Sequence, residues 1–464
     1  MQNYLIKNIS IVNEGLIQQG DLLIKNGRIE KILPQITSAN TDVKEINGEG
    51  KFLLPGVIDD QVHFREPGLT HKATIYTEAK AGVAGGVTSF MEMPNTIPPA
   101  FTQELLEDKY KIASQTSLAN YSFYMGTSND NADEVLKTNK KKNGVCGVKI
   151  FMGSSTGNLL VDNPSTLTKI FSESELLIAT HCEDERIIRQ NLDKLRIQKK
   201  ELTAADHPFI RNEEACFESS LRAIQIAQKH NTRLHILHIS TEKELQLFSN
   251  IMPLKEKRIT AEVCVHHLHF TSDDYDRLGN QIKCNPAIKS PNNKKALWNA
   301  MLDNRLDVIA TDHAPHTLVE KGLIRNSNGL ITPPPEVGRG PYEKAHAGLP
   351  LVQHSLLLML YYYKQGKIPL VKIVEKMSHA VADCFNIAER GYIREGYFAD
   401  LVIVDLNQHT TVSRENILYK CGWSPLENVE FPASINHTFV NGNLVFENGM
   451  FNESQKGSRL TFDR

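Results

Sequence analysis

The segment GVIDDQVH, which spans Gly56–His63, is a short apolar run that ends in polar side chains, and later segments of the chain have the same form. The complete set is Gly56–His63, Val87–Met93, Tyr121–Met125, Gly147–Met152, Leu176–Cys182, Arg233–Ser240, Arg258–His266 and Val308–Asp312. Longer amphipathic stretches separate them, as in repeated units of one strand and one helix. The pattern predicts an α/β fold in the form of a (β/α)8 TIM barrel, with the active site where the strands end. An open, doubly wound sheet is the competing fold.

Both ends of the chain are rich in strand-forming residues. Near the start, DLLIKNGRIEKIL contains the hairpin signal Asn26-Gly27, and near the end HTFVNGNLVFENG (His437–Gly449) contains a second Asn-Gly pair. We therefore expect one small β-sandwich domain formed by residues 1–54 and 395–464 together. The barrel domain is expected over residues 55–394.

Length and charge exclude several classes of protein. The 464 residues suit a barrel with an appended module. Lys and Arg total 52 against 54 for Asp and Glu, so the chain has no general attraction for nucleic acid or an anionic membrane. The N-terminus has no basic stretch followed by an apolar core, and no apolar run approaches the roughly 20 residues of a membrane span. We expect a cytoplasmic protein with a small-molecule substrate.

Two further features concern cysteines and a long loop. The seven cysteines are scattered and never spaced as CxxC, which indicates reduced, mostly buried side chains. The segment Thr317–Ala345, which contains Pro333–Pro335, is expected to be a structureless excursion after the eighth strand.

Residues that bind metals stand at the ends of several predicted strands. His63 follows the first strand, His181 ends ELLIATH, and Asp312 ends VIATD. Taken singly, a buried histidine is most often a hydrogen-bonded core residue, and an aspartate at such a place is often a helix cap. Together they converge on one barrel mouth, where imidazole and carboxylate groups are the ligands that zinc takes.

Side chains alternate between the two faces of a strand, and this alternation predicts which side chains of two other strands point into the barrel. Lys149 in GVKIFMG shares the face of Gly147 and Phe151, an odd place for a lysine without a chemical role, although a lone lysine at a strand end usually reaches water. In RLHILHIST, His235 and His238 fall on opposite faces of the strand, so only His238 is expected to point inward.

Six motifs then occur in an order and spacing that fit the barrel. They are VHFREPG (Val62–Gly68), MPNT (Met93–Thr96), HCED (His181–Asp184), HILHIST (His235–Thr241), KCNPAIK (Lys283–Lys289) and ATDHAPH (Ala310–His316). Together they resemble the dihydroorotases of the amidohydrolase superfamily, over nearly the whole chain. The resemblance implies a barrel of the metal-dependent hydrolase type and the reversible hydrolysis of dihydroorotate to N-carbamoyl-L-aspartate, a step of de novo pyrimidine biosynthesis.

The resemblance also implies a metal centre with one or two Zn²⁺ ions. His63 and Asp312 would bind one ion, and His181 and His238 the other. Lys149, carboxylated by carbon dioxide, would bridge the pair. A buried lysine has a lowered pKa, and its neutral amine can form such a carbamate. Asp312 would also serve as the general base and acid.

Substrate contacts carried over from the family fall on Arg65, Asn95, Asn285 and His316, with backbone groups at Ala347-Gly348. Arg65 offers a forked donor to a substrate carboxylate, and the others can hydrogen-bond the ring or that carboxylate. Taken alone, Arg65 is an ordinary surface ion-pair residue and Asn95 a turn residue. Their place in the ordered set singles them out.

Two positions depart from the family pattern. Gln61 replaces the first histidine of the usual His-x-His motif, and an amide oxygen is a poorer zinc ligand than imidazole. The segment AHAGLP (Ala345–Pro350) replaces the usual proline-serine-glycine version of a substrate-contacting loop. These departures weaken the expected first metal site and the ring contacts at Ala347-Gly348.

Two rival hypotheses remain at this point. One is a related cyclic amidase, a dihydropyrimidinase, hydantoinase or allantoinase, which shares the metal centre but does not need Arg65 and Asn95 to bind a carboxylate. The other is a non-catalytic, dihydroorotase-like scaffold that binds aspartate transcarbamoylase, which Gln61 makes worth considering. A homodimer is the expected self-association.

Overall fold

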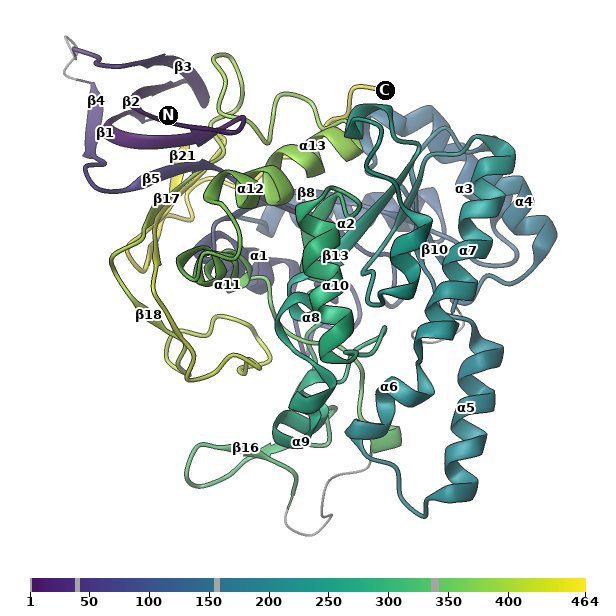
Figure 1. Ribbon diagram of the computed structural model, residues 1–464. Coiled ribbons are helices and arrows are strands. Elements are labelled where there is room, and N and C mark those ends of the chain that lie inside the picture. Colours follow the sequence, from purple (N-terminus) through teal and green to yellow (C-terminus); the bar gives the residue numbers. More distant parts are fainter. Residues whose placement is uncertain (1, 38–41, 154–158, 335–341) are drawn as a thin grey trace.

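A closed barrel of parallel strands occupies the middle of the chain (Figure 1). The computed structural model describes residues 2–37, 42–153, 159–334 and 342–464. The barrel strands are β6 (Val57–Val62), β7 (Val87–Glu92), β8 (Asn120–Phe123) with β9 (Met125–Gly126), β10 (Val148–Phe151), β11 (Ile178–His181), β12 (Leu234–Ile236), β13 (Ile259–Cys264) and β14 (Val308–Ala310). Neighbours in this order pair in parallel, and a bridge between Val62 and His313 joins the first strand to the last. The closed ring confirms the predicted barrel and excludes the open sheet.

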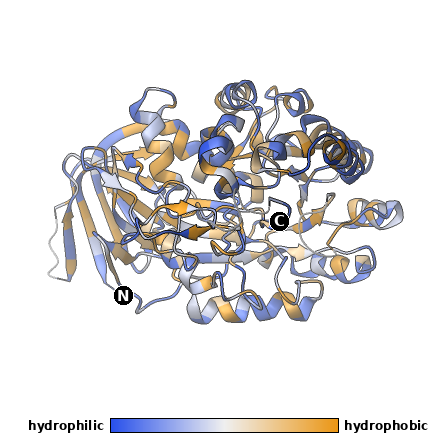
Figure 2. Cartoon of the chain, turned by 90° about the horizontal axis from the view of Figure 1, so that it is seen from below, coloured by the Kyte–Doolittle hydropathy of each residue, from blue (hydrophilic) through white to orange (hydrophobic). Residues whose placement is uncertain are grey.

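Amphipathic helices surround the barrel. The longer ones are α1 (Ile75–Ala84), α2 (Gln103–Thr116), α4 (Pro164–Glu173), α5 (Glu185–Gln198), α7 (Glu213–His230), α10 (Pro291–Leu302) and α11 (Ser355–Lys364). Figure 2 shows the central strands largely in the hydrophobic colour, with hydrophilic residues on the surrounding helices. In the described ranges, no helix is both long and apolar enough to cross a membrane.

Local sequence explains where the longest of these helices begins and ends. The side chain of Asn212 accepts a hydrogen bond from the backbone N–H of Ala215 and so caps the first turn of α7. Acidic residues stand in its first turn and basic ones in its last, which complements the helix dipole. Asn231 then adopts a left-handed conformation (φ 54°) and ends the helix.

A nine-stranded sheet takes strands from both ends of the chain. Its members are β1 (Asn3–Asn13), β2 (Leu16–Lys25), β3 (Arg28–Leu33), β4 (Val43–Asn47), β5 (Phe52–Pro55), β17 (Leu401–Asp405), β20 (Ser434–Val440), β21 (Asn443–Glu447) and β22 (Met450–Phe451). β5 joins the two halves because it pairs with β1 on one side and β17 on the other. At the predicted hairpin, Asn26 and Gly27 both have positive φ, as a two-residue turn requires.

The long segment after the eighth strand is more ordered than its sequence suggests. Two short strands, β15 (Ile324–Arg325) and β16 (Ile331–Thr332), form a hairpin within it. The prediction of a structureless loop over Thr317–Ala345 is therefore wrong for this part. Pro335 and residues 336–341 lie outside the described residues.

Candidate active site

A small cavity of about 30 Å³ lies at the carboxyl ends of the barrel strands. Its lining consists of Gln61, His63, Arg65, Asn95, Lys149, Phe151, His181, His238, Asn285, Asp312, Ala314, Ala347 and Gly348. The structure thus brings together the site residues predicted from the sequence, with one exception. His316 lies behind Arg65, with its Nε2 3.1 Å from a guanidinium nitrogen of that residue. Phe151 and Ala314 line the cavity without having been predicted.

Side chains from the first and last strands meet on one side of this cavity. His63 Nε2 lies 3.0 Å from Asp312 Oδ1, and His63 Nδ1 lies 2.7 Å from Asn95 Oδ1. Gln61 Nε2 donates to the same Asp312 oxygen at 3.1 Å. Gln61 therefore turns its amide N–H, and not its carbonyl, toward the carboxylate. In this orientation it supports Asp312 but offers no lone pair to a metal beside it.

Two histidines form the opposite side. His181 Nδ1 lies 2.9 Å from His238 Nε2, and both rings are buried. The other nitrogen of His181 faces Glu183 Oε2 at 3.1 Å, and Glu183 also pairs with Arg211. A carboxylate behind a histidine fixes its orientation and is typical of metal-binding sites. Sequence reasoning missed Glu183, because a glutamate directly after a strand usually lies at the surface.

Lys149 interacts electrostatically with both pairs. Its ammonium group lies 4.6 Å from the centre of the Phe151 ring, and the side chain is 1% exposed. Burial lowers the pKa of Lys149 to about 7, although the charges of Asp312 and Glu262 oppose this shift. A substantial fraction of the amine is therefore neutral near pH 7, which carbamate formation requires.

The histidines of the sixth strand overturn the prediction made from strand alternation. His235 points into the barrel, where its Nε2 lies 3.2 Å from Asp60 Oδ2. His238 nevertheless reaches the cavity because β12 ends at Ile236 and His238 adopts a positive φ of 42°. The backbone N–H of His238 donates to Glu262 Oε1 at 2.9 Å, which holds this uncommon conformation. Both histidines thus lie inside the barrel.

Ionisation states across the cavity suit a divalent cation. Burial lowers the pKa of His63 and of His181, and lowers that of His238 well below its ordinary value. Burial opposes ionisation of Asp312, but the hydrogen bond with His63 and the charge of Lys149 hold its pKa below the usual value. Neutral imidazoles and an ionised carboxylate are the forms that bind zinc. The donor set therefore fits a metal centre.

Arg65 brings a buried positive charge to the cavity, with Asp312, Glu92 and Glu320 near enough to act on it electrostatically. The guanidinium is 4% exposed, and its Nε donates to the backbone oxygen of Pro315 at 3.2 Å. Burial lowers its pKa to about 10, so it remains charged. Across the described ranges of the chain, no carboxylate forms an ion pair with it. His316 lies between two cations, because its Nε2 contacts Arg65 and its Nδ1 lies 3.1 Å from Lys72 Nζ. A buried cation without a carboxylate partner is a site for an anionic ligand.

A larger cavity of about 510 Å³ adjoins the small one and shares Asn285 and Ala347 with it. Its basic side chains are Arg189, Arg196, Arg211, Lys283 and Lys344, and its acidic side chains are Glu185 and Glu343. This excess of basic groups favours the approach of an anion, although the chain as a whole is nearly neutral.

Lys321 holds the loop of residues 345–348, which lines both cavities. It is fully buried, and its Nζ donates to the backbone oxygens of Lys283, His346 and Gly348, each at 2.9 Å. Gly348 has a φ of 143°, and a Cβ there would lie 2.4 Å from the oxygen of Ala314. Only glycine fits this close approach. The lysine was not singled out from the sequence, since its three partners are distant along the chain.

Substituting Lys321 with methionine is expected to loosen this loop, because methionine cannot donate to the three carbonyls. We expect KM to rise about tenfold, with a smaller change in kcat, because loss of substrate positioning acts first on binding. Steady-state kinetics measure both constants. Lys376→Met is the matched control, since Lys376 is also buried and donates to the backbone oxygens of Leu306 and Asp307. An equal rise in KM in both variants would attribute the effect to general destabilisation.

Comparison with known proteins agrees with this fold and identifies the family. The model of the amidohydrolase family matches residues 52–445. The chain therefore belongs to the amidohydrolase family, and it is an enzyme.

Curated relatives cover nearly the whole chain. A dihydroorotase from Pyrococcus abyssi is 30% identical, with 96% of each chain covered. One from Methanosphaera stadtmanae is 29% identical over 96% of each chain. An allantoinase from Desulfitobacterium hafniense is 27% identical over 98% of each chain. The names of these relatives differ, so family membership does not by itself fix the substrate.

Among solved structures, the L-hydantoinase (dihydropyrimidinase) from Arthrobacter aurescens matches with a TM-score of 0.90 and 25% identity, covering 99% of this chain and 100% of that one. The dihydropyrimidinase from Brevibacillus agri matches with a TM-score of 0.86 and 23% identity, covering 100% of each chain. These matches confirm the predicted combination of a barrel with a small β domain.

Proposed function

We propose that the protein is a dihydroorotase, which hydrolyses the cyclic amide of dihydroorotate to N-carbamoyl-L-aspartate and catalyses the reverse reaction. The observation that carries this proposal is the buried guanidinium of Arg65 at the cavity, with no carboxylate partner in the described part of the chain. Dihydroorotate carries a ring carboxylate that can pair with it. Dihydrouracil and hydantoin have no such group.

The metal centre is proposed to hold one or two Zn²⁺ ions. His63 and Asp312 are the proposed ligands of one ion, His181 and His238 those of the other, and carboxylated Lys149 the bridge. Bound zinc supplies Lewis acidity and lowers the pKa of a water molecule toward neutrality. The rest of the mechanism belongs to the chain itself.

Asp312 is the proposed proton carrier. Its low pKa keeps it ionised, and its Oδ1 accepts from Gln61 and contacts His63. It can take the proton of the attacking water and pass it to the leaving ring nitrogen. Arg65, Asn95, Asn285 and His316 are proposed to orient the substrate, together with the backbone at Ala347-Gly348.

The test is an assay of the purified protein with added zinc on four substrates: dihydroorotate, dihydrouracil, hydantoin and allantoin. Preference for dihydroorotate supports the proposal, and preference for any of the others would assign the protein to a different cyclic amidase. A protein that is inert under all metal conditions and forms a stable complex with an aspartate transcarbamoylase would be the scaffold instead.

Restoring histidine at position 61 is expected to strengthen zinc binding on the side of His63. The wild-type amide donates to Asp312 and gives no ligand, whereas an imidazole there can coordinate. We expect Gln61→His to lower the zinc concentration for half-maximal activity by about tenfold or more. Zinc titration of activity and metal analysis measure this change. Gln61→Asn is the control that keeps an amide. An identical zinc requirement in wild type and Gln61→His would show that position 61 does not limit the site.

A further inference from the structure

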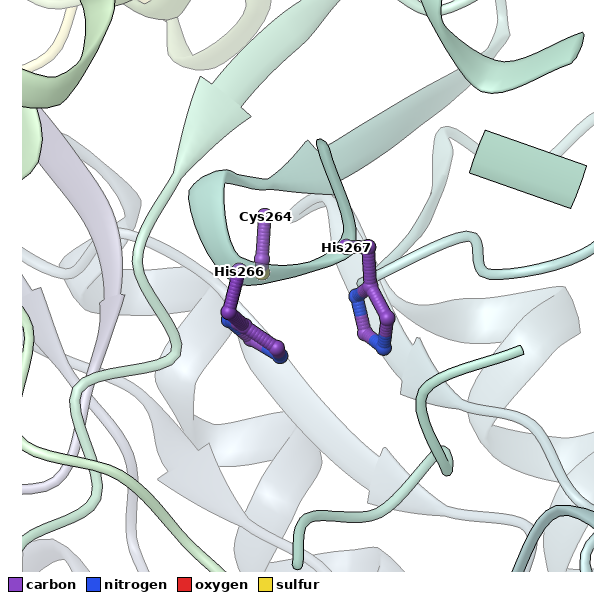
Figure 3. A group of neighbouring side chains, drawn as sticks. All are labelled: Cys264, His266 and His267. Carbon is purple, nitrogen blue, oxygen red and sulfur yellow. The ribbon is translucent and has the colours of Figure 1, made fainter. Parts of the chain in front are cut away.

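A second group of potential metal ligands lies at the end of β13, where the chain turns into α8 (Val265–His269). Figure 3 shows Cys264, His266 and His267 on this turn, with both imidazole rings on the same side of it. One ligand atom from each residue lies within 4.8 Å of the others. The three side chains are 0%, 1% and 3% exposed, respectively. None of them belongs to the proposed ligand set of the active site.

His267 has the hydrogen-bonding pattern of a metal ligand. Its Nε2 lies 3.2 Å from the backbone oxygen of Pro286, to which it can only donate. The lone pair is therefore on Nδ1, and in the described part of the chain that atom is buried with no hydrogen-bond partner. Metal-bound histidines commonly donate their other N–H to a backbone carbonyl in this way.

His266 adds to the case, because both of its ring nitrogens are buried and neither makes a well-formed hydrogen bond, its one polar interaction being with the backbone of Thr311. Its ring centre lies 4.1 Å from that of His267. A buried polar group without a partner costs free energy, which a bound ligand removes. Two such imidazoles side by side indicate a shared ligand.

Cys264 completes the set from the other side of the turn. Its Sγ lies 3.1 Å from Glu262 Oε1 and 3.8 Å from Gln61 Oε1. The carboxylates of Glu262, Asp312 and Asp59 all interact electrostatically with this thiol. The negative charge of these carboxylates favours the binding of a divalent cation over that of an anion.

We propose that Cys264, His266 and His267 bind one zinc ion at a site separate from the active-site metals. Sulfur with two imidazole nitrogens is a ligand set typical of tetrahedral zinc, and Gln61 Oε1 or a water can fill the fourth position. Binding releases the thiol proton to solvent as the zinc–sulfur bond forms. Gln61 then links the two sites, because its amide nitrogen contacts Asp312 while its oxygen faces Cys264.

Cobalt substitution tests this proposal with a signal independent of activity. The full-length, metal-free protein is titrated with Co²⁺, and the thiolate-to-cobalt charge-transfer band is recorded in the near ultraviolet. The proposed active-site ligands contain no sulfur, so the band reports Cys264. We expect the band in the wild type and its loss in Cys264→Ser, with weaker cobalt binding in His267→Asn. Cys182→Ser is the matched control and should keep the band, although Cys182 directly follows His181.

Lys149→Ala separates the two sites. If the band persists in this variant while cobalt at the active site is lost, the cluster binds metal by itself, whatever the enzyme's substrate. If the band disappears with Lys149, the thiol belongs to the active-site centre, and the separate site is refuted. Zinc X-ray absorption on the wild type is the check that needs no variant: a sulfur shell at about 2.3 Å supports the site, and its absence at full zinc loading refutes it.

Discussion

Replacing Lys149 with alanine is expected to remove bound metal and activity together. Without a bridging carbamate, two neighbouring divalent cations repel each other with little shielding inside the barrel. Loss of the metal removes several kcal/mol of transition-state stabilisation, so we expect activity to fall on the order of a thousandfold or more. Metal content per chain and turnover of dihydroorotate measure the two effects.

Two controls accompany this experiment. Short carboxylic acids can fill the space of the missing side chain and are expected to restore part of both metal and activity. Lys376→Ala removes another buried lysine, whose pKa burial lowers to about 8, away from the cavity, and should retain its metal. Full metal content and full activity in Lys149→Ala would disprove the bridge.

The barrel and most of the cavity could be predicted because their signals are local. Each strand is an apolar run that ends in a polar group, and the carboxyl ends of barrel strands meet at one mouth. His63, Lys149 and Asp312 were placed correctly at the cavity by this reasoning.

Other features depend on where strands end, which the sequence specifies poorly. Alternation predicted that only His238 points inward, but β12 ends two residues before it, and the positive φ of His238 breaks the alternation. His235, which lies within β12, takes the inward face of the strand and lies beside Asp60 in the barrel interior. The pattern of apolar residues in the sequence does not predict such a change of backbone conformation.

Buried charges were the other features missed. Glu183, Glu262 and Lys321 all appear as ordinary surface residues in the sequence, because each has a partner that is distant along the chain, such as Arg211 for Glu183 and His238 for Glu262. The cysteines were interpreted as reduced, mostly buried side chains. For Cys264, the closely spaced histidines at positions 266 and 267 were a local signal that could have suggested metal binding.

Arg65 is expected to decide the choice of substrate. Its backbone has a positive φ of 69°, and its side chain is fixed by Pro315 and His316, so the guanidinium is oriented before substrate arrives. Loss of a buried, charge-assisted bond typically costs about 2–5 kcal/mol. Arg65→Met should therefore lower kcat/KM for dihydroorotate on the order of a hundredfold or more. Its effect on dihydrouracil, which has no carboxylate, should be small.

Arg464→Met is the matched control for this prediction. Arg464 is half-buried, with a pKa that burial lowers to about 10, and its guanidinium donates to the backbone oxygens of Cys146 and Phe385. It is not among the residues that line the cavity. Its loss should reduce stability without changing the ratio of kcat/KM between the two substrates.

If Arg65→Met lowers kcat/KM equally for dihydroorotate and dihydrouracil, Arg65 supports the fold of the site and does not recognise the carboxylate. A wild-type enzyme that prefers dihydrouracil would contradict the dihydroorotase assignment itself, because the same metal ligands would then serve a substrate for which the buried guanidinium has no anionic partner.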